Sequence, residues 1–162
     1  MHFEKVSLKE WKHALKMVFG WDDGLAEEAY DKIQLPKRSS INSAGYDFFL
    51  PFGWEFGRHP GPMFPLGVRW VGEPHQVLLL MPRSGLGTKY GFRLCNTIGV
   101  IDADYCNSDN EGHILMRAVA DQNLLIEGGK AVIQGIVVNY AIASDDVTTD
   151  TRNGGFGSSD KA

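Results

Sequence analysis

The residues best suited to chemistry lie in one stretch of the chain, from Pro82 to Gly112. An Arg-Ser-Gly turn at 83–85 comes first, and Asp102 follows fewer than twenty residues later, after the apolar run Ile98–Ile101. Guanidinium, hydroxyl and backbone N–H groups bind phosphate oxygens. A carboxylate held at the end of a buried strand can orient a water molecule and accept its proton. The combination indicates hydrolysis of a phosphorylated compound.

Both features also have a purely structural interpretation. Arg83-Ser84-Gly85 can be a surface turn that follows the strand Val77–Met81, and Asp102 can belong to an Asp-rich turn that ends a strand. Along an extended chain, the neighbouring Asp104 and Tyr105 are expected to face in different directions. Neither feature decides the function by itself.

Two amide side chains could extend such a site. Asn96 carries donors and an acceptor that suit one edge of a nucleobase, although it can also be a turn residue. Gln134 lies within the long apolar run Ala131–Ile142, where its amide needs hydrogen-bond partners. It is either a satisfied core amide or a site residue.

The tail from Ser144 to Ala162 is polar and rich in glycine, a composition typical of solvated segments. It nevertheless contains Arg152 and then Phe156 among glycines and serines. Phe156 could stack on a planar base while the neighbouring hydroxyl and backbone N–H groups meet a phosphate. The tail can therefore be interpreted as a closing flap.

Two helices are expected to precede the strands that position these residues. Ser7 and Glu10 have the spacing of a capping box, and the apolar spacing predicts a helix that ends at Gly20. Asp22 or Asp23 can cap a second helix through about residue 32, with Leu25, Ala29 and Ile33 on its inner side. Periodic apolar faces usually pack, so this segment is expected to cover the core.

From Lys37 onward, short apolar runs alternate with glycine and proline, which predicts strands joined by tight turns. A parallel sheet would require helices to alternate with strands, and the sequence shows no such alternation. The sequence therefore predicts an all-β sandwich or barrel with a small helical N-terminal segment. The expected strands lie at 47–51, 64–71, 76–81, 92–94, 98–101, 114–120 and 131–142.

Composition narrows the class of protein. The 162 residues suffice for one domain, and a net charge of −4 argues against a nucleic-acid or membrane-surface binder. No apolar run reaches the roughly twenty residues of a membrane span, and the N-terminus lacks a secretory signal. Cys95 and Cys106 show no metal-ligand spacing. These observations predict a cytoplasmic protein with reduced cysteines.

Taken in order, these residues resemble the trimeric dUTPase family, which cleaves dUTP to dUMP and pyrophosphate. Each motif is weak alone, but an ordered set with sensible spacing is specific. The motifs that carry the resemblance are Ser43-Ala-Gly-Tyr-Asp47, Pro82-Arg-Ser-Gly85, Asn96-Thr-Ile-Gly-Val-Ile-Asp-Ala-Asp-Tyr105, Gly129–Gln134 and Arg152–Ser159.

The resemblance implies a role for each matched residue. Asp102 is similar to the carboxylate that activates the water attacking the α-phosphorus, and Gln134 to the glutamine that positions this water. Asp47 resembles the residue that organises the water shell of the metal. The residues that resemble the phosphate turn, the uracil-reading hairpin, the deoxyribose wall and the flap are Arg83, Ser84, Gly85, Asn96, Gly99, Val100, Ile101, Tyr105, Arg152, Phe156, Gly157 and Ser158.

The same resemblance implies an architecture and a cofactor. We expect an all-β, dUTPase-like distorted jelly roll (a β-clip barrel) that forms a homotrimer, with each active site assembled from several subunits. Mg²⁺ is expected to arrive with the triphosphate, and dUTP is the expected ligand. Residues 1–36 would be a helical extension, 37–143 the β-rich core and 144–162 the flap.

Two alternatives stay open at the level of sequence. A dCTP deaminase of the related fold would carry a glutamate in the third motif and lack the Gly-Phe-Gly flap, whereas this chain has Asp102 and keeps the flap. A regulatory binding protein on the same fold would use the N-terminal extension, or the lengthened 106–111 hairpin, as a surface for a protein partner.

Overall fold

The computed structural model describes residues 1–150, and two helices open the chain after a first short strand. Helix α1 (Leu8–Phe19) begins where the Ser7 hydroxyl accepts a hydrogen bond from the Glu10 N–H, and it ends at Gly20, which adopts a φ of 68°. Helix α2 (Asp23–Asp31) begins at Asp22, whose carboxylate accepts from the Leu25 N–H. These predicted caps are confirmed.

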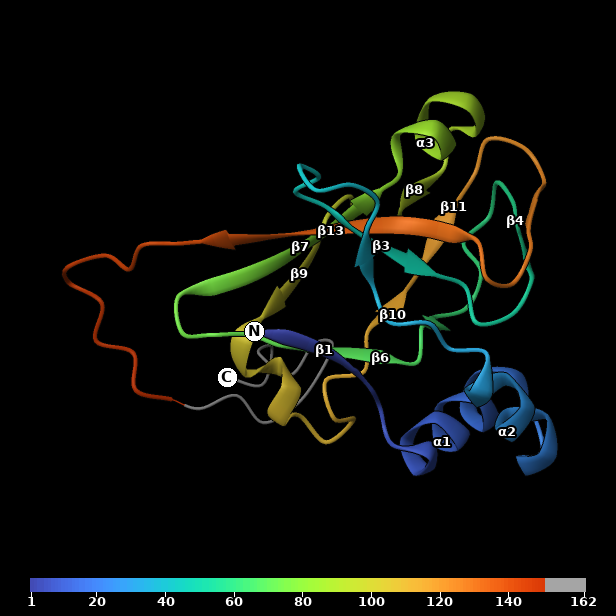
Figure 1. Ribbon diagram of the computed structural model, residues 1–162, viewed down its shortest axis with the longest axis horizontal. Coiled ribbons are helices and arrows are strands. Elements are labelled where there is room, and N and C mark those ends of the chain that lie inside the picture. The colour runs from blue at the N-terminus through green and yellow to red at the C-terminus, as the bar shows by residue number, and fades with distance from the viewer. Residues whose placement is uncertain (151–162) are drawn as a thin grey trace.

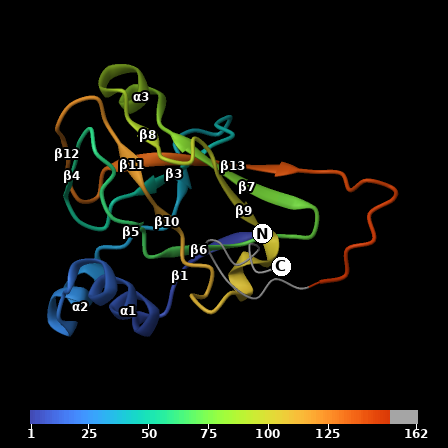
Figure 2. The same ribbon diagram turned by 180° about the vertical axis from the view of Figure 1, so that it is seen from behind.

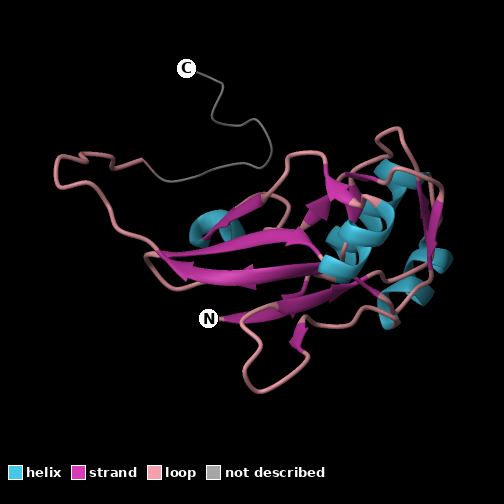
Figure 3. Cartoon of the chain, turned by 90° about the horizontal axis from the view of Figure 1, so that it is seen from above, coloured by secondary structure: helices cyan, strands magenta, loops and turns pink. Residues whose placement is uncertain are grey.

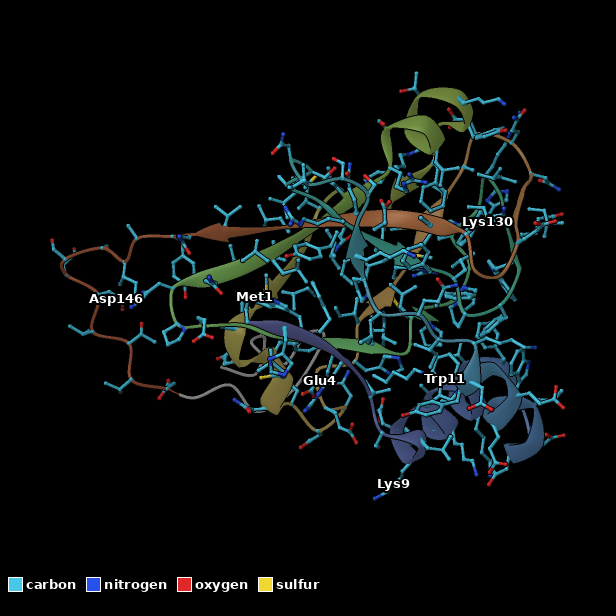
Figure 4. All side chains as sticks on the ribbon, in the orientation of Figure 1. Met1, Glu4, Lys9, Trp11, Lys130 and Asp146 are labelled. Carbon is cyan, nitrogen blue, oxygen red and sulfur yellow. The ribbon has the colours of Figure 1, made fainter. Side chains whose placement is uncertain are left out.

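The two helices pack on the strands through their small and aromatic residues. Trp11 and Leu15 of α1 are fully buried, and Ala26 and Ala29 of α2 join them in the same core. Figure 4 shows Trp11 on the inner side of α1 and Lys9 pointing outward. The prediction that Leu25 faces inward is wrong: Leu25 is 50% exposed, because the buried face of α2 passes one residue later, through Ala26.

A cluster of aromatic rings joins this segment to the strands. Phe19 and Trp21 lie against Phe52, Trp54 and Phe64, with ring centroids 4.6 to 5.8 Å apart. Rings at such distances contribute more than their buried area alone. The helices therefore share the core of the strands, at the end of the molecule opposite the projecting ends of β7 and β13 (Figures 1 and 2).

Antiparallel strands dominate the described chain after the two helices, which confirms the predicted β architecture with a helical N-terminal segment. The central sheet has the order β2-β3-β13-β7-β9, and the long strands β7 and β13 run side by side in Figure 3. Its strands are β2 (Lys37–Arg38), β3 (Tyr46–Phe49), β13 (Ala131–Asn139), β7 (Gln76–Pro82) and β9 (Gly99–Asp102).

Four two-stranded pairs surround this sheet: β1-β6, β5-β10, β8-β11 and β4-β12. Gly67, with a φ of 73°, separates two strands where the sequence predicted a single run over 64–71. The strands of the four pairs are β1 (His2–Lys5), β6 (Val68–Val71), β5 (Phe64–Pro65), β10 (Leu115–Met116), β8 (Arg93–Leu94), β11 (Ala118–Val119), β4 (Trp54–Phe56) and β12 (Leu124–Ile126).

The central sheet has two different faces. One face contributes Phe48, Leu78, Leu80, Ile101 and Ile133 to the core, and each is at most 8% exposed. Side chains alternate along a strand, so the other face carries the intervening residues. That face is partly open, and it is apolar except near its ends: Val77, Leu79, Met81, Val100, Ile136 and Val138.

Two segments that the sequence assigned to turns or extended chain are helical. Arg83-Ser84-Gly85 does not form a surface turn, because helix α3 (Ser84–Tyr90) begins there with Arg83 at its N-cap position. Asp104 and Tyr105 do not lie along an extended chain, because the 3₁₀ helix η1 (Ala103–Asn107) follows β9 at once. In the described residues no helix is long and apolar enough to cross a membrane.

Candidate functional site

Asp47, Arg83 and Gln134, which we call the sheet cluster, lie together at one end of the partly open face. Gln134 of β13 is directly opposite Asp47 of β3 and Met81 of β7, so the three side chains project to the same face. The Arg83 Nε lies 3.0 Å from the Asp47 Oδ1, and the Gln134 Nε2 donates to the Pro82 carbonyl at 3.4 Å. The pairing of three strands thus gathers residues from three of the predicted motifs.

Gly45 of the first motif makes room for this arrangement. A Cβ atom at position 45 would lie 3.0 Å from the Gln134 Oε1 and 3.7 Å from its Cβ, so the amide packs directly over the Gly45 backbone. The absence of a side chain at position 45 therefore helps to set the position of Gln134.

The Arg83-Ser84-Gly85 segment presents its polar groups to solvent beside the sheet cluster. The Arg83 side chain is 44% exposed although its guanidinium pairs with Asp47, and a Cβ atom at Gly85 would meet nothing within 4 Å. Arg83 keeps further N–H groups for a second anion, since a guanidinium has five donors. Binding of an oxyanion by this segment therefore stays a prediction, with the start of a helix in place of the expected turn.

Asn96 lies in the tight turn between β8 and β9. The Ile98 N–H donates to the Asn96 carbonyl at 2.7 Å, Thr97 has a φ of 66°, and the Asn96 side chain is exposed. Strand β9 then carries Gly99, Val100 and Ile101 to Asp102. A Cβ atom at Gly99 would lie 3.1 Å from the Leu80 Cβ, so this backbone runs close against β7.

Asp102 and Tyr105 begin a second group, the Asp102 loop, which we define as residues 102–113. Asp102 is half-buried at the end of β9 and precedes η1 with a φ of −74°. Tyr105 is only 6% exposed, and its hydroxyl donates to the His113 carbonyl at 3.1 Å. The ring of Tyr105 is therefore a firmly held part of this loop.

The sheet cluster and Asp102 lie on the same face of the central sheet but far apart. Asp102 is opposite Val77, which is opposite Val138, and Val138 comes four residues after Gln134 on β13. That offset is roughly 13 Å along the strand and about 10 Å across two strand spacings, which places Asp102 roughly 16 Å from Gln134. One copy of the chain therefore does not bring these two residues into one site.

The carboxyl of Glu111 in the Asp102 loop has an altered acidity. Burial alone would raise its pKa, but hydrogen bonds from the Ser7 hydroxyl and backbone N–H, together with the nearby Arg69 guanidinium, lower the pKa overall. Sequence patterns predicted no role for Glu111 or His113, and none for the Glu10 carboxylate beyond its cap. No local pattern could have found them, since Ser7 and Glu111 are 104 positions apart.

No group of three His, Cys, Asp or Glu side chains able to hold a metal ion occurs within residues 1–150. Asp47 is the carboxylate beside the candidate phosphate-binding residues, and it faces Arg83. These donors suit a metal ion that arrives on a phosphorylated ligand and meets the protein through its water shell. The predicted tail residues Arg152, Phe156, Gly157 and Ser158 lie outside the described residues.

Comparison with known proteins places these features in a family. A family model described as dUTPase matches residues 31–160. The chain is 38% identical over 131 residues to the deoxyuridine 5'-triphosphate nucleotidohydrolase of Lactococcus lactis, covering 78% of this chain and 87% of that protein. It is 31% identical over 141 residues to the protein of the same name from Mannheimia succiniciproducens, covering 81% and 90%.

Solved structures show a similar arrangement. The dUTPase from Streptococcus mutans superposes with a TM-score of 0.66 at 29% identity, covering 89% of this chain and 99% of that chain. A mutant dUTPase from phage phi11 of S. aureus, described with a structural Mg(II) ion, gives a TM-score of 0.60 at 17% identity, covering 74% and 92%. The second likeness is one of fold alone.

Proposed function

The chain belongs to the dUTPase family, and from this membership we infer that it hydrolyses dUTP to dUMP and pyrophosphate. Its mostly-β fold is of the dUTPase, jelly-roll type. The observation that carries the function is the match of residues 31–160 to the family, which covers the sheet cluster and Asp102. The comparisons favour the hydrolase over the deaminase alternative, since the relatives described above are dUTP hydrolases.

Asp102 is the proposed general base. Its carboxylate accepts a proton from a water molecule while the water oxygen forms a bond to the α-phosphorus. The bond from the α-phosphorus to the bridging oxygen breaks, and pyrophosphate leaves with the electron pair. The position of Asp102 at the end of a paired strand supports this role, because the backbone there is fixed on one side by β7.

The sheet cluster is the proposed phosphate-binding part. Arg83, with Ser84 and Gly85, would bind phosphate oxygens, and the Gln134 amide would orient the attacking water and the α-phosphate. The ion pair between Asp47 and Arg83 supports the assignment, because it holds the guanidinium over the face that carries Gln134. Arg152, Gly157 and Ser158 are proposed to add contacts from the tail.

The turn and strand that lead to Asp102 are the proposed nucleoside-binding part. Asn96 and the backbone of Gly99, Val100 and Ile101 would read the edge of uracil, while Phe156 would stack on its face. Tyr105 would pack against the deoxyribose. A buried ring with a tethered hydroxyl cannot move aside for a 2′-hydroxyl, so Tyr105 would exclude ribonucleotides.

These two parts would meet only between copies of the chain. A general base and the amide that orients the same water must both lie within a few ångströms of the reacting atoms. The offset of roughly 16 Å between Asp102 and Gln134 is too large for that. We therefore propose that one subunit supplies the Asp102 loop and another the sheet cluster, in a homotrimer whose contacts cover the partly open apolar face of the central sheet.

Mg²⁺ is the proposed cofactor. Asp47, the carboxylate paired with Arg83 in the proposed phosphate site, would bind it through water. The ion would neutralise charge on the triphosphate, which an acidic chain with a net charge of −4 needs.

The function is tested by measuring pyrophosphate release from dUTP, dCTP, dTTP and UTP with Mg²⁺, for the native chain and for Asp102→Asn. We expect turnover of dUTP alone and a loss of about 10²- to 10⁴-fold in kcat for Asp102→Asn, the usual contribution of a general base. Release of ammonia from dCTP would instead support the deaminase. Absence of turnover for all four nucleotides would contradict the hydrolase assignment.

A further inference from the structure

The outer half of the Asp102 loop, residues 108–113, lies between helix α1 and the phenol of Tyr105. Glu111 binds the start of the helix through two hydrogen bonds. Its Oε1 accepts from the Ser7 hydroxyl at 2.6 Å, and its Oε2 accepts from the Ser7 N–H at 2.8 Å. The sequence predicted that Glu10 would make the second of these bonds. Because Glu111 takes that place, the Glu10 carboxylate is available for another partner.

That partner is His113, which is fully buried. The Gly67 N–H donates to its Nε2 at 3.0 Å, so Nε2 must carry the lone pair and Nδ1 the proton. The Nδ1–H then donates to the Glu10 Oε1 at 3.0 Å, and the Glu10 side chain is itself only 12% exposed. The imidazole is thus fixed from both sides, by α1 and by the backbone before β6.

The same residue also holds Tyr105. The Tyr105 hydroxyl donates to the His113 carbonyl, and the Asn110 Nδ2 donates to the Tyr105 hydroxyl at 2.9 Å. The His113 N–H donates to the Asn110 carbonyl at 2.9 Å, which closes the loop on itself. One continuous set of hydrogen bonds therefore leads from the first turn of α1 to the phenol.

The backbone of this loop permits little adjustment. Gly112 has a φ of 73°, and a Cβ atom there would lie 2.5 Å from the Cys106 Cα. Glu111 has a φ of 59°, a conformation that is unfavourable for a residue other than glycine. Such a conformation persists where surrounding contacts hold it, and the two bonds from Ser7 are contacts of that kind.

We propose that Glu10 and Glu111 are positioning residues for Tyr105, so that the N-terminal segment sets how strongly the enzyme rejects ribonucleotides. The inference rests on the proposed function, in which Tyr105 packs against the deoxyribose. Glu10 acts through His113, and Glu111 acts through the loop backbone. Neither touches the substrate; they hold the sugar-binding wall in place.

The experiment compares kcat/KM for dUTP and UTP in the native chain, Glu10→Ala, Glu10→Gln and Lys12→Gln. Glu10→Ala leaves the buried His113 Nδ1–H without an acceptor, and we expect the UTP-to-dUTP ratio of kcat/KM to rise about five- to tenfold. Glu10→Gln keeps an oxygen that accepts this bond and should restore the native ratio. Lys12→Gln is the matched control, because Lys12 on the same helix pairs with Asp23 and Glu27 and not with the loop.

Thermal unfolding of each variant separates positioning from support of the fold. A purely structural role would lower the Tm of Glu10→Ala and leave the UTP-to-dUTP ratio native, which would overturn the inference. If Glu10→Ala does not fold, Glu111→Gln tests the same inference, because its amide replaces one of the two oxygens that accept bonds from Ser7 with an N–H donor. The ratio should rise in that variant too, and a native ratio would overturn the inference. Failure of the native chain to hydrolyse dUTP would instead overturn the proposed function, so the two failures are distinct.

Discussion

The sheet cluster and the Asp102 loop are built in different ways. Strand pairing places Asp47 and Gln134 directly opposite each other. Arg83 directly follows β7, which pairs with β13, and its Nε lies 3.0 Å from the Asp47 Oδ1. The Asp102 loop leaves the sheet after β9 and depends on side-chain hydrogen bonds to α1, as in the pairs Ser7–Glu111 and Glu10–His113. Backbone pairing secures the first, and the N-terminal segment secures the second.

This difference implies separate sensitivities. The sheet cluster should lose its function only when one of its own side chains is replaced or when the central sheet is disturbed. The Asp102 loop should respond to changes in a helix that contributes no residue to the reaction. The variants below test this contrast.

Among the variants that test this contrast, Arg83→Ala is expected to have the largest effect. Removing a donor that meets charge in the transition state typically costs about 10²- to 10³-fold in kcat. The fold should be unaffected, because an ion pair with a 44% exposed guanidinium contributes little to stability. Steady-state kinetics with dUTP, together with a thermal unfolding curve, checks both statements. A large drop in Tm would show that the pair supports the sheet and not only the substrate.

A second variant, Gly135→Val, should disturb the sheet cluster through the fold. A Cβ atom at Gly135 would lie 2.8 Å from both the Leu78 Cδ1 and the Phe48 Cε2, so a larger side chain overpacks the core beside Gln134. We expect the free energy of unfolding to fall by about 1–3 kcal/mol. Denaturant unfolding measures this loss. If Gly135→Val keeps the native free energy of unfolding, β13 can shift freely, which would contradict a cluster held in place by strand pairing.

The smallest effect is expected on stability at acidic pH. The pKa of Glu111 is lowered in the folded chain from its usual value of 4.5, so its bonds to Ser7 add stability at higher pH. That contribution should disappear as the pH falls below 4.5 and through the lowered pKa. The difference in unfolding free energy between the native chain and Glu111→Gln should therefore shrink over that range.

Asp146→Asn provides the comparison for this titration. Its pKa is also lowered, but by hydrogen bonds from Thr148 within an exposed turn. This variant should leave the UTP-to-dUTP ratio of kcat/KM at its native value, whereas Glu111→Gln should raise that ratio. A Glu111→Gln difference that grows on acidification would contradict the contact with Ser7.

Local rules account for what the sequence predicted well. Helix α1 ends at Gly20 and helix α2 begins at Asp22, as expected, because caps depend on neighbouring residues. Most predicted strands occur near their expected positions. Strands β4 and β12 were missed because three residues carry too short a pattern. Helix α3 was missed because Gly85 and Gly87 are poor helix formers, which the tertiary structure overrides.

The long-range contacts could not be predicted from the residues alone. Ser7 and Glu10 have the spacing of a capping box, yet the reciprocal bond comes from Glu111, which is distant in sequence. Similarly, nothing in the spacing of Asp102 and Gln134 reveals that they lie at opposite ends of one sheet face. Both facts follow from the topology that pairs β13 with β7 and β7 with β9.

The central claim is that one active site takes its two halves from different copies of the chain. It is tested most directly by co-expressing Asp102→Asn and Arg83→Ala chains with different tags and isolating the mixed oligomers. Each parent alone should be inactive. If the halves come from neighbouring copies, mixed trimers should recover about a third of native dUTP turnover, since one of the three sites in each mixed trimer pairs two intact halves. Mixed oligomers no more active than the parents would contradict the claim.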